Sequence, residues 1–330
     1  MKEEKIGLLP LYLKLYDDTV PSMRPRVERF CAAIASALEQ QGLHIDAAPI
    51  CRVEPEFRAA IKHFEQEGVS AIVTLHLAYS PSLESAEALA GTKLPLILLD
   101  TTENFAFDNT VDAGEILYNH GIHGVQDLSN LLRRHHKDYE IFAGHYEKSD
   151  VIARTARACR GAIMAKRMRV SRVGLVGGPF TGMGDFFVPF DELKRDIGIE
   201  VVPYDDREGE RRIAAVTQAQ IDEEYARDEA FFAVDPSVTR PLYDRTARVN
   251  LALRKWRDEQ NLNALTVNFL ATENSNPALP VMPFTECSRS MAEGIGYAGE
   301  GDVLTAALVG ALLSAFPETT FSETFCPDWK

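Results

Sequence analysis

Histidine is absent from the second half of this 330-residue sequence, because all eight histidines lie at or before His145. A metal site in the second half must therefore use carboxylates or take imidazole from elsewhere. Cysteine is also sparse. The five cysteines are scattered without CxxC spacing, which argues against both a disulfide framework and a cysteine zinc site.

Long apolar runs and excess positive charge are missing as well. No apolar run is long enough to span a bilayer, and the first residues, MKEEKIGLLPLYL, lack the basic start and cleavage site of a signal peptide. The net charge of −14 would repel phosphate backbones and anionic lipid. We therefore expect a cytoplasmic protein that binds neither nucleic acid nor membrane.

Apolar strand-like runs alternate with amphipathic helical runs along most of the chain. This alternation predicts an α/β fold with parallel sheets covered on both faces. The length predicts two domains, which we place at 1–168 and 169–330. Strands are expected at 5–13, 44–50, 70–77, 94–100, 139–146, 171–178, 197–205 and 263–271, and helices at 25–42, 54–68, 113–137, 207–232, 235–260 and 301–316.

Several polar positions fall at the ends of these strands or in the helices. The loop VGGPFTGMG follows a strand but has neither the GxGxxG order nor a following Lys-Ser/Thr, which favours a flexible loop over a phosphate loop. His120 and His123 lie three residues apart in a helical pattern, where a metal-binding role competes with a commoner surface or packing role. His76 and His145 lie at the carboxyl ends of expected strands, at the loop edge where ligands gather, but histidines there more often serve as hydrogen-bonded loop residues.

The sequence AGEGD at 298–302 carries the clearest local signal. Helix capping alone explains Asp302, which precedes an apolar helical run. Capping does not explain Glu300, which stands between two glycines that would let a ligand approach closely. Glu323 follows in the strand-like TTFSETF, and a return from helix to strand would bring it beside Glu300. Two carboxylates in one cleft can bind a divalent cation or divide acid and base work.

These segments together resemble the metal-dependent L-fucose/L-arabinose isomerase superfamily. The resemblance rests on GYAGEGDVLTAAL followed by TTFSETF, on VTLHLAYSPSLESAEALAGTKLPLILLDTTENF, and on NHGIHGVQDLSNLLRRHHKDYEIFAGHY. The resemblance covers nearly the whole chain, in the same order as in the family. AGEGD with the later glutamate is the most specific of them.

The resemblance implies an N-terminal flavodoxin-like domain, a central Rossmann-like domain and a C-terminal β-rich domain. It also implies an intramolecular oxidoreductase that interconverts an aldose and a ketose through a metal-bound enediol, with Mn²⁺ or another divalent cation. Glu300 and Glu323 match the two acidic metal ligands, which also form the acid–base pair. Residues matching the sugar pocket are Tyr16, Met183 and Phe269. His120 matches a substrate-contacting histidine that reaches a neighbouring subunit, so a monosaccharide substrate and a homo-oligomer, trimer or hexamer, are expected.

Two departures from the family pattern affect this interpretation. Leu117 stands where arabinose isomerases have a pocket glutamine, which puts L-arabinose itself in doubt. Family members also continue well past the position of Lys330 and take metal-binding histidines from that later part. We therefore expect half a metal site and no C-terminal β-rich domain, in either a fragment or a shortened gene product.

A second hypothesis is a non-catalytic cytoplasmic sugar-binding or regulatory protein derived from the isomerase fold. The presence of an imidazole metal ligand distinguishes the enzyme hypothesis from the binding hypothesis. If His120 or His76 of a neighbouring subunit completes the metal shell, catalysis is expected, and if neither does, the chain is expected only to bind sugar. A third hypothesis is a different metal-dependent reaction on a hydroxylated substrate.

Overall fold

The computed structural model describes residues 4–273 and 275–329 of the chain. The chain divides into two compact units, Met1–Ile163 and Met164–Lys330. Helix α7 (Val151–Arg169) contains both this division and the position near Met168 at which we expected the boundary. Each unit has its own sheet, and every strand pairing in both sheets is parallel.

The first unit contains a five-stranded sheet in the order β2-β1-β3-β4-β5, which is the flavodoxin-like order. In its central pair, Leu8 of β1 lies opposite Val73 of β3. The strands are β1 (Lys5–Leu11), β2 (His44–Ala47), β3 (Ile72–His76), β4 (Leu96–Asp100) and β5 (Tyr139–Ala143).

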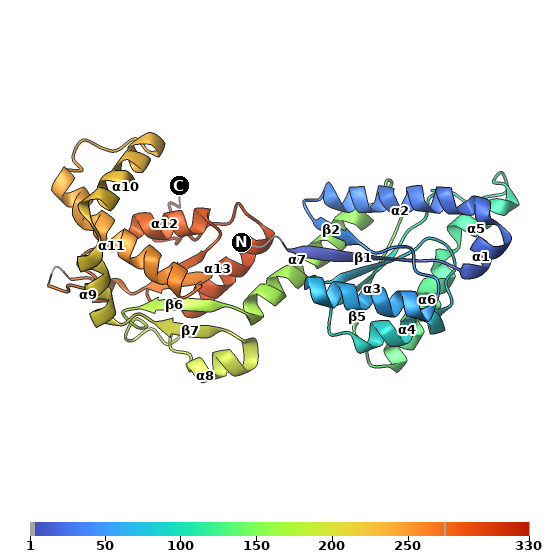
Figure 1. Cartoon of the computed structure of the whole chain (residues 1–330), viewed down its shortest axis with the longest axis horizontal. Coiled ribbons are helices and arrows are strands. Elements are labelled where there is room, and N and C mark those ends of the chain that lie inside the picture. Colours follow the sequence, from blue (N-terminus) through green and yellow to red (C-terminus); the bar gives the residue numbers. More distant parts are fainter. Residues whose placement is uncertain (1–3, 274, 330) are drawn as a thin grey trace. The chain divides into compact units, whose positions relative to one another are not determined.

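Helices cover both faces of this sheet (Figure 1). Apolar residues of α3, α4 and α6 pack with Leu9, Ile72 and Leu98 on one face, and α2 lies on the opposite side. Gly68, at φ 68°, ends α3 in the left-handed conformation that glycine adopts without strain. The helices are α1 (Lys14–Thr19), η1 (Pro21–Met23), α2 (Arg24–Glu39), α3 (Glu54–Glu67), α4 (Ser82–Gly91), η2 (Ala113–Glu115), α5 (Ile116–Asn119) and α6 (Gly121–Arg134).

The second unit contains a four-stranded sheet in the order β7-β6-β8-β9. Alternate residues of each strand face opposite sides, so that Val176 and Val267 pack on α11 and α12 while Leu175 and Ala264 pack on α13. The strands are β6 (Arg172–Val176), β7 (Glu200–Pro203), β8 (Ala264–Val267) and β9 (Gly296–Gly299).

The helices of the second unit include an extra layer in which α9, α10 and α11 share a small core around Ile221 and Ala252. Although α13 is almost wholly apolar, no helix in the described part of the chain is long and apolar enough to cross a membrane. The helices are α8 (Phe190–Glu192), η3 (Leu193–Ile197), α9 (Asp206–Ala215), α10 (Gln218–Phe231), α11 (Arg240–Glu259), η4 (Phe269–Ala271), α12 (Phe284–Ala292) and α13 (Val303–Ala315).

The α/β class and the two parallel-sheet units are confirmed, and three local expectations are wrong. The helix expected at 113–137 is interrupted at His120, and the one expected at 207–232 is two helices, α9 and α10. The segment TTFSETF is not a strand, since residues 316–329 contain neither helix nor strand.

Candidate functional site

Aromatic and imidazole side chains of the first unit gather where the sheet order reverses, between β1 and β3. Tyr12 and Tyr16 follow β1, whereas His76 ends β3 and Tyr79 follows it. In open parallel sheets, ligands bind at the carboxyl ends of the strands at such a point. The topology therefore places these residues where a ligand site is expected.

Tyr16 and His120, both expected in a sugar site, lie in direct contact. The hydroxyl of Tyr16 is 3.0 Å from Nε2 of His120, and their rings are stacked with centroids 6.1 Å apart. Tyr79 and His123 flank the same imidazole, with ring centroids at 6.3 and 6.0 Å. The predicted pair thus lies within a half-buried cluster of four side chains that offers hydrogen-bonding groups and ring faces.

Burial keeps the Tyr16–His120 pair uncharged near neutral pH. It raises the pKa of Tyr16 above its ordinary value. The pKa of His120 is lowered, first by burial and then by the neighbouring His123. A neutral imidazole and a phenol offer donors and acceptors without net charge, which suits the hydroxyl groups of a neutral ligand.

The helix that begins just after the break at His120 packs closely on the residue beneath it. A Cβ on Gly121 would lie 2.8 Å from the carbonyl oxygen of His76, and one on Gly124 would lie 2.4 Å from Cδ2 of the same residue. Only glycine allows α6 to approach β3 this closely. His76 is 3% exposed, and neither ring nitrogen has a hydrogen-bond partner among the described residues. Burial lowers the pKa of His76 to about 4, so its ring is neutral.

An ionic anchor that sequence reasoning missed holds the segment before His120. Arg26 of α2 donates two 2.7 Å hydrogen bonds to Glu115 and one of 2.6 Å to Glu103. The Arg26 guanidinium lowers the pKa of Glu115 to about 2. The main-chain N–H of Asn104 donates to the side chain of Asn119 at 2.9 Å. Arg26 and Glu115 are 89 positions apart, so no local pattern reveals the contact.

In the second unit, three expected site residues follow the carboxyl ends of strands that are adjacent in the sheet. Phe269 lies shortly after β8, Glu300 comes directly after β9, and the glycine-rich loop with Met183 follows β6. The sheet order reverses between β6 and β8, so this edge also meets the condition for a ligand site. Tyr16 and His120 belong to the first unit, so the six expected residues are divided between the units.

Glu300 holds an unusual backbone conformation. Its φ is 62°, a left-handed value that costs a residue with a side chain roughly 1–3 kcal/mol. Its N–H donates to the carbonyl of Val267 at 3.0 Å, and the N–H of Gly301 donates to the hydroxyl of Thr266 at 3.0 Å. The Glu300 carboxylate is half-buried, and no hydrogen bond or ion pair from it is found within residues 4–273 and 275–329. A strained, partly buried carboxylate without a partner is a candidate for ligand binding.

The loop after β6 is hydrogen-bonded to Glu300 and packs closely on Gly301. The N–H of Phe180 donates to the Glu300 carbonyl at 2.9 Å, and a Cβ on Gly301 would lie 2.4 Å from the Gly178 oxygen. The Phe180 ring packs on Phe269 with centroids 5.4 Å apart, and the N–H of Met183 donates to the Phe180 carbonyl at 3.3 Å. The structure thus brings the Met183 backbone, Phe269 and Glu300 together through Phe180, which sequence reasoning missed.

Asp302 and Glu323 have different surroundings from Glu300. The Asp302 side chain accepts a 2.9 Å hydrogen bond from the N–H of Thr305, which confirms its role as the N-cap of α13. Glu323 is exposed, and its negative charge is one of the causes that raise the pKa of Tyr297 in β9, after burial and Cys287. The structure therefore gives Glu323 a place beside β9 but no recorded contact with Glu300.

Carboxylate oxygens are suitable ligands for Mn²⁺ or Mg²⁺, but two carboxylates do not complete a site. The described residues contain no group of three or more His, Cys, Asp or Glu side chains that would hold a metal ion. By themselves these residues fit at most part of a cation shell.

Comparisons with known proteins agree with this organisation. Residues 192–315 match the model of the L-arabinose isomerase central domain, a range that includes β7–β9, Phe269 and Glu300. L-arabinose isomerase of Thermotoga neapolitana is 25% identical over 87% of this chain and 58% of its own length. That of Acidothermus cellulolyticus is 26% identical over 90% of this chain and 60% of its own.

The chain is similar to members of the L-fucose/L-arabinose isomerase superfamily. A third superfamily member, L-arabinose isomerase of Clostridium beijerinckii, is 26% identical over 74% of this chain and 50% of its own length. The chain thus spans about half to three-fifths of the length of the curated relatives that it matches. The resemblance read from the sequence motifs is therefore confirmed at the level of the superfamily.

Proposed function

We propose that this chain supplies sugar-binding and acid–base residues of an aldose–ketose isomerase. The observation that carries the proposal is Glu300 at the carboxyl end of β9, a strained carboxylate with no partner among the described residues, whose carbonyl binds Phe180, which packs on Phe269. Backbone strain concentrates at functional sites. The names of the relatives, each an L-arabinose isomerase, support the class of reaction.

The proposed roles follow from the chemistry of each group. In the isomerisation, the C2 proton of the aldose moves to C1 and the hydroxyl proton on O2 moves to O1. Glu300 and Glu323 are the acid–base pair for these transfers, since carboxylates can accept and return protons in place. Phe269 and Met183 offer apolar contact to the carbon chain of the sugar. Tyr16 and His120 bind its hydroxyl groups as a neutral hydrogen-bonding pair.

We further propose that Glu300 and Glu323 contribute two ligands to a Mn²⁺ ion, whose remaining ligands come from another polypeptide or another segment. The proposal includes assembly into a homo-oligomer. His120 would act at the site of a neighbouring copy in a trimer or hexamer. The exposed apolar side chains of Leu15, Ile116 and Ile122 flank the Tyr16 and His120 positions in sequence and would be covered by such an assembly.

A second candidate function is sugar binding without catalysis. It is favoured by one observation, that the described residues gather no group of three metal-ligating side chains. In that case Tyr16 and His120 in the first unit, and Phe269 and Glu300 in the second, would serve only to bind saccharide. Glu300 would then accept hydrogen bonds from sugar hydroxyl groups.

The test uses L-arabinitol, an unreactive open-chain polyol, titrated into the full chain by calorimetry with and without Mn²⁺. The isomerase proposal predicts saturable binding that Mn²⁺ tightens and that Glu300→Gln abolishes. Ketose formation from L-fucose, L-arabinose, D-arabinose or D-galactose would identify the substrate. Binding that ignores Mn²⁺, with no ketose formed, would favour the second candidate. Absence of any polyol binding would contradict both.

A further inference from the structure

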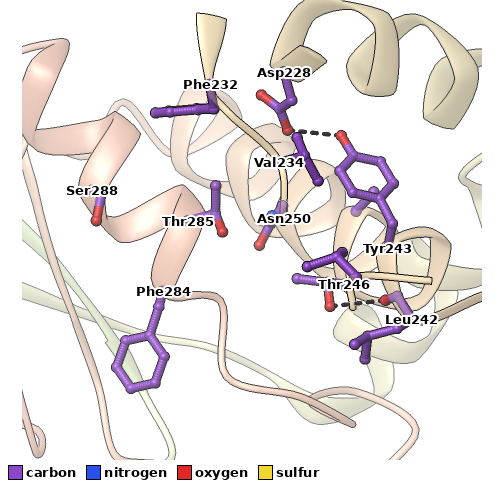
Figure 2. Close-up of a pocket in the computed structure, with 12 residues that line it drawn as sticks. Asp228, Phe232, Val234, Leu242, Tyr243, Thr246, Asn250, Phe284, Thr285 and Ser288 are labelled. Carbon is purple, nitrogen blue, oxygen red and sulfur yellow. Dashed lines mark hydrogen bonds between the residues drawn. The ribbon is translucent and has the colours of Figure 1, made fainter. Parts of the chain in front are cut away.

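The second unit contains a cavity of about 550 Å³ that none of the proposed isomerase residues lines. It lies between the end of α10, the loop at 232–238, the first half of α11 and the first turns of α12 (Figure 2). Sites for small molecules typically measure 300–1,000 Å³. Its volume is therefore that of a ligand site.

The walls of the cavity are mainly apolar. Phe232, Val234, Leu242 and Phe284 surround it in Figure 2, and the ring of Tyr243 adds a further flat face. Phe284 is 63% exposed and Leu242 is 50% exposed, so large apolar side chains meet solvent at the rim. Exposure of apolar surface to water is unfavourable, so an apolar ligand that covers these side chains would bind with a favourable free energy.

One buried polar atom in the cavity lacks a partner. Asn250 of α11 is 6% exposed, and its Oδ1 accepts no hydrogen bond from any described residue. Figure 2 shows Asn250 among the lining residues, between Thr246 and Thr285. A buried acceptor left unsatisfied costs about 1–3 kcal/mol. A ligand that donates a hydrogen bond here would remove that cost.

The charged groups near the cavity are already paired with one another. Asp228 accepts a 2.7 Å hydrogen bond from the Tyr243 hydroxyl at Oδ2 and an ionic hydrogen bond from Arg289 at Oδ1. The burial of Tyr243 and its bond to Asp228 raise the pKa of this phenol, so it stays protonated. The cavity therefore offers an incoming charge no unpaired counter-charge, which favours a neutral ligand.

We propose that this cavity binds an uncharged aromatic or alicyclic molecule with an O–H or N–H group that donates to Oδ1 of Asn250. The apolar body packs between Phe232, Leu242 and Phe284. This is a ligand class separate from the hydrophilic sugar of the proposed reaction. It does not depend on that reaction being correct.

A matched pair of probes tests the donor requirement. 2-Naphthol carries the hydroxyl donor, and 2-methoxynaphthalene has the same ring body without it. Calorimetric titration of the full chain should show saturable binding of 2-naphthol about tenfold tighter than that of 2-methoxynaphthalene, because one hydrogen bond to an otherwise unpaired acceptor contributes about 1–1.5 kcal/mol. Methyl NMR should place the probe at Val234 and Leu242.

Variants test the location of the site, and they are chosen so that a loss of probe binding is not explained by a loss of folding. Asn250→Leu should remove the preference between the two probes. Phe284→Ala changes an exposed residue and should weaken the binding of both probes several-fold, whereas Phe105→Ala, at a similarly exposed phenylalanine of the first unit, should change the binding of neither. Glu300→Gln should leave probe binding unaltered, which keeps this result distinct from the isomerase test.

Three outcomes would overturn the proposal. One is equal affinity for the two probes, and another is binding that Phe284→Ala leaves intact. The third is an assembly of copies, detected by sedimentation, that Thr285→Glu dissociates. In that case the cavity is a contact between copies instead of a ligand site.

Discussion

The N–H of Phe180 donates to the carbonyl of Glu300 at 2.9 Å, so the loop after β6 is bound to the residue that follows β9. This one contact joins two strand ends that lie more than a hundred positions apart in sequence. It also holds Glu300 in its left-handed conformation, since the carbonyl orientation depends on the backbone angles of Glu300. The site therefore depends on main-chain geometry as much as on the carboxylate.

Replacing Glu300 by glycine should separate stability from function. Glycine adopts a φ of 62° without strain, so Glu300→Gly should raise the free energy of unfolding by about 1 kcal/mol while removing Mn²⁺ binding. Urea unfolding followed by tryptophan fluorescence measures this, since both tryptophans, Trp256 and Trp329, lie in the second unit. Asn261→Gly, at φ 51°, is the matched control and should leave Mn²⁺ affinity unchanged. A marked loss of stability in Glu300→Gly would contradict the strain argument.

The Tyr16 hydroxyl is expected to bind the sugar jointly with His120. Tyr16→Phe removes one donor and acceptor from the 3.0 Å pair and should weaken monosaccharide binding about five- to tenfold, since a hydrogen bond contributes about 1 kcal/mol. Saturation-transfer NMR in the presence of Mn²⁺ measures the affinity. Tyr139→Phe, in β5, is the control and should have no effect. Equal affinities of wild type and Tyr16→Phe would exclude Tyr16 from the sugar site.

Close packing of α6 on His76 makes Gly124 irreplaceable. A Cβ there would lie 2.4 Å from Cδ2 of His76, so Gly124→Ala should destabilise the first unit by about 1–3 kcal/mol. Hydrogen exchange in peptides of the first unit reports this directly. Gly161→Ala in α7 has no atom within 4 Å of the new Cβ and should be neutral or stabilising. Equal hydrogen-exchange rates in Gly124→Ala and Gly161→Ala would contradict the close packing of α6 on His76.

Burial of His76 predicts a specific acid sensitivity of the first unit. Its folded pKa of about 4 lies below the unfolded value near 6.5, so between these values the unfolded chain binds more protons. Its stabilising contribution is present above about pH 6.5 and is lost as the pH falls toward 4, by up to about 3 kcal/mol. His76→Leu should flatten the pH dependence of hydrogen exchange in this window. His135→Gln, at an exposed histidine, should leave the dependence as it is in the wild type.

Local patterns were sufficient to predict the alternating strands and helices, the parallel sheets and the position of Glu300 just before the apolar helix α13, but not β9, the strand that precedes it. They were not sufficient at His120, because helical periodicity runs through NHGIHG, whereas the close packing of Gly121 on His76 is a tertiary contact that no local pattern reveals. The Arg26–Glu115 contact and the Phe180–Phe269 contact join distant positions, so no short motif marks them. The cavity around Asn250 likewise requires residues from three helices.

The affinity of the chain for Mn²⁺ with and without the Glu300 charge tests the central claim most directly. Glu300→Gln is nearly isosteric but removes the charge that a hard cation requires. Free Mn²⁺ can be followed by its electron paramagnetic resonance signal, with Asp302→Asn as the control for loss of a neighbouring carboxylate that only caps α13. We predict at least tenfold weaker binding in Glu300→Gln and little change in Asp302→Asn. Equal Mn²⁺ affinity in the wild type and Glu300→Gln would contradict the assignment of Glu300 as a metal ligand.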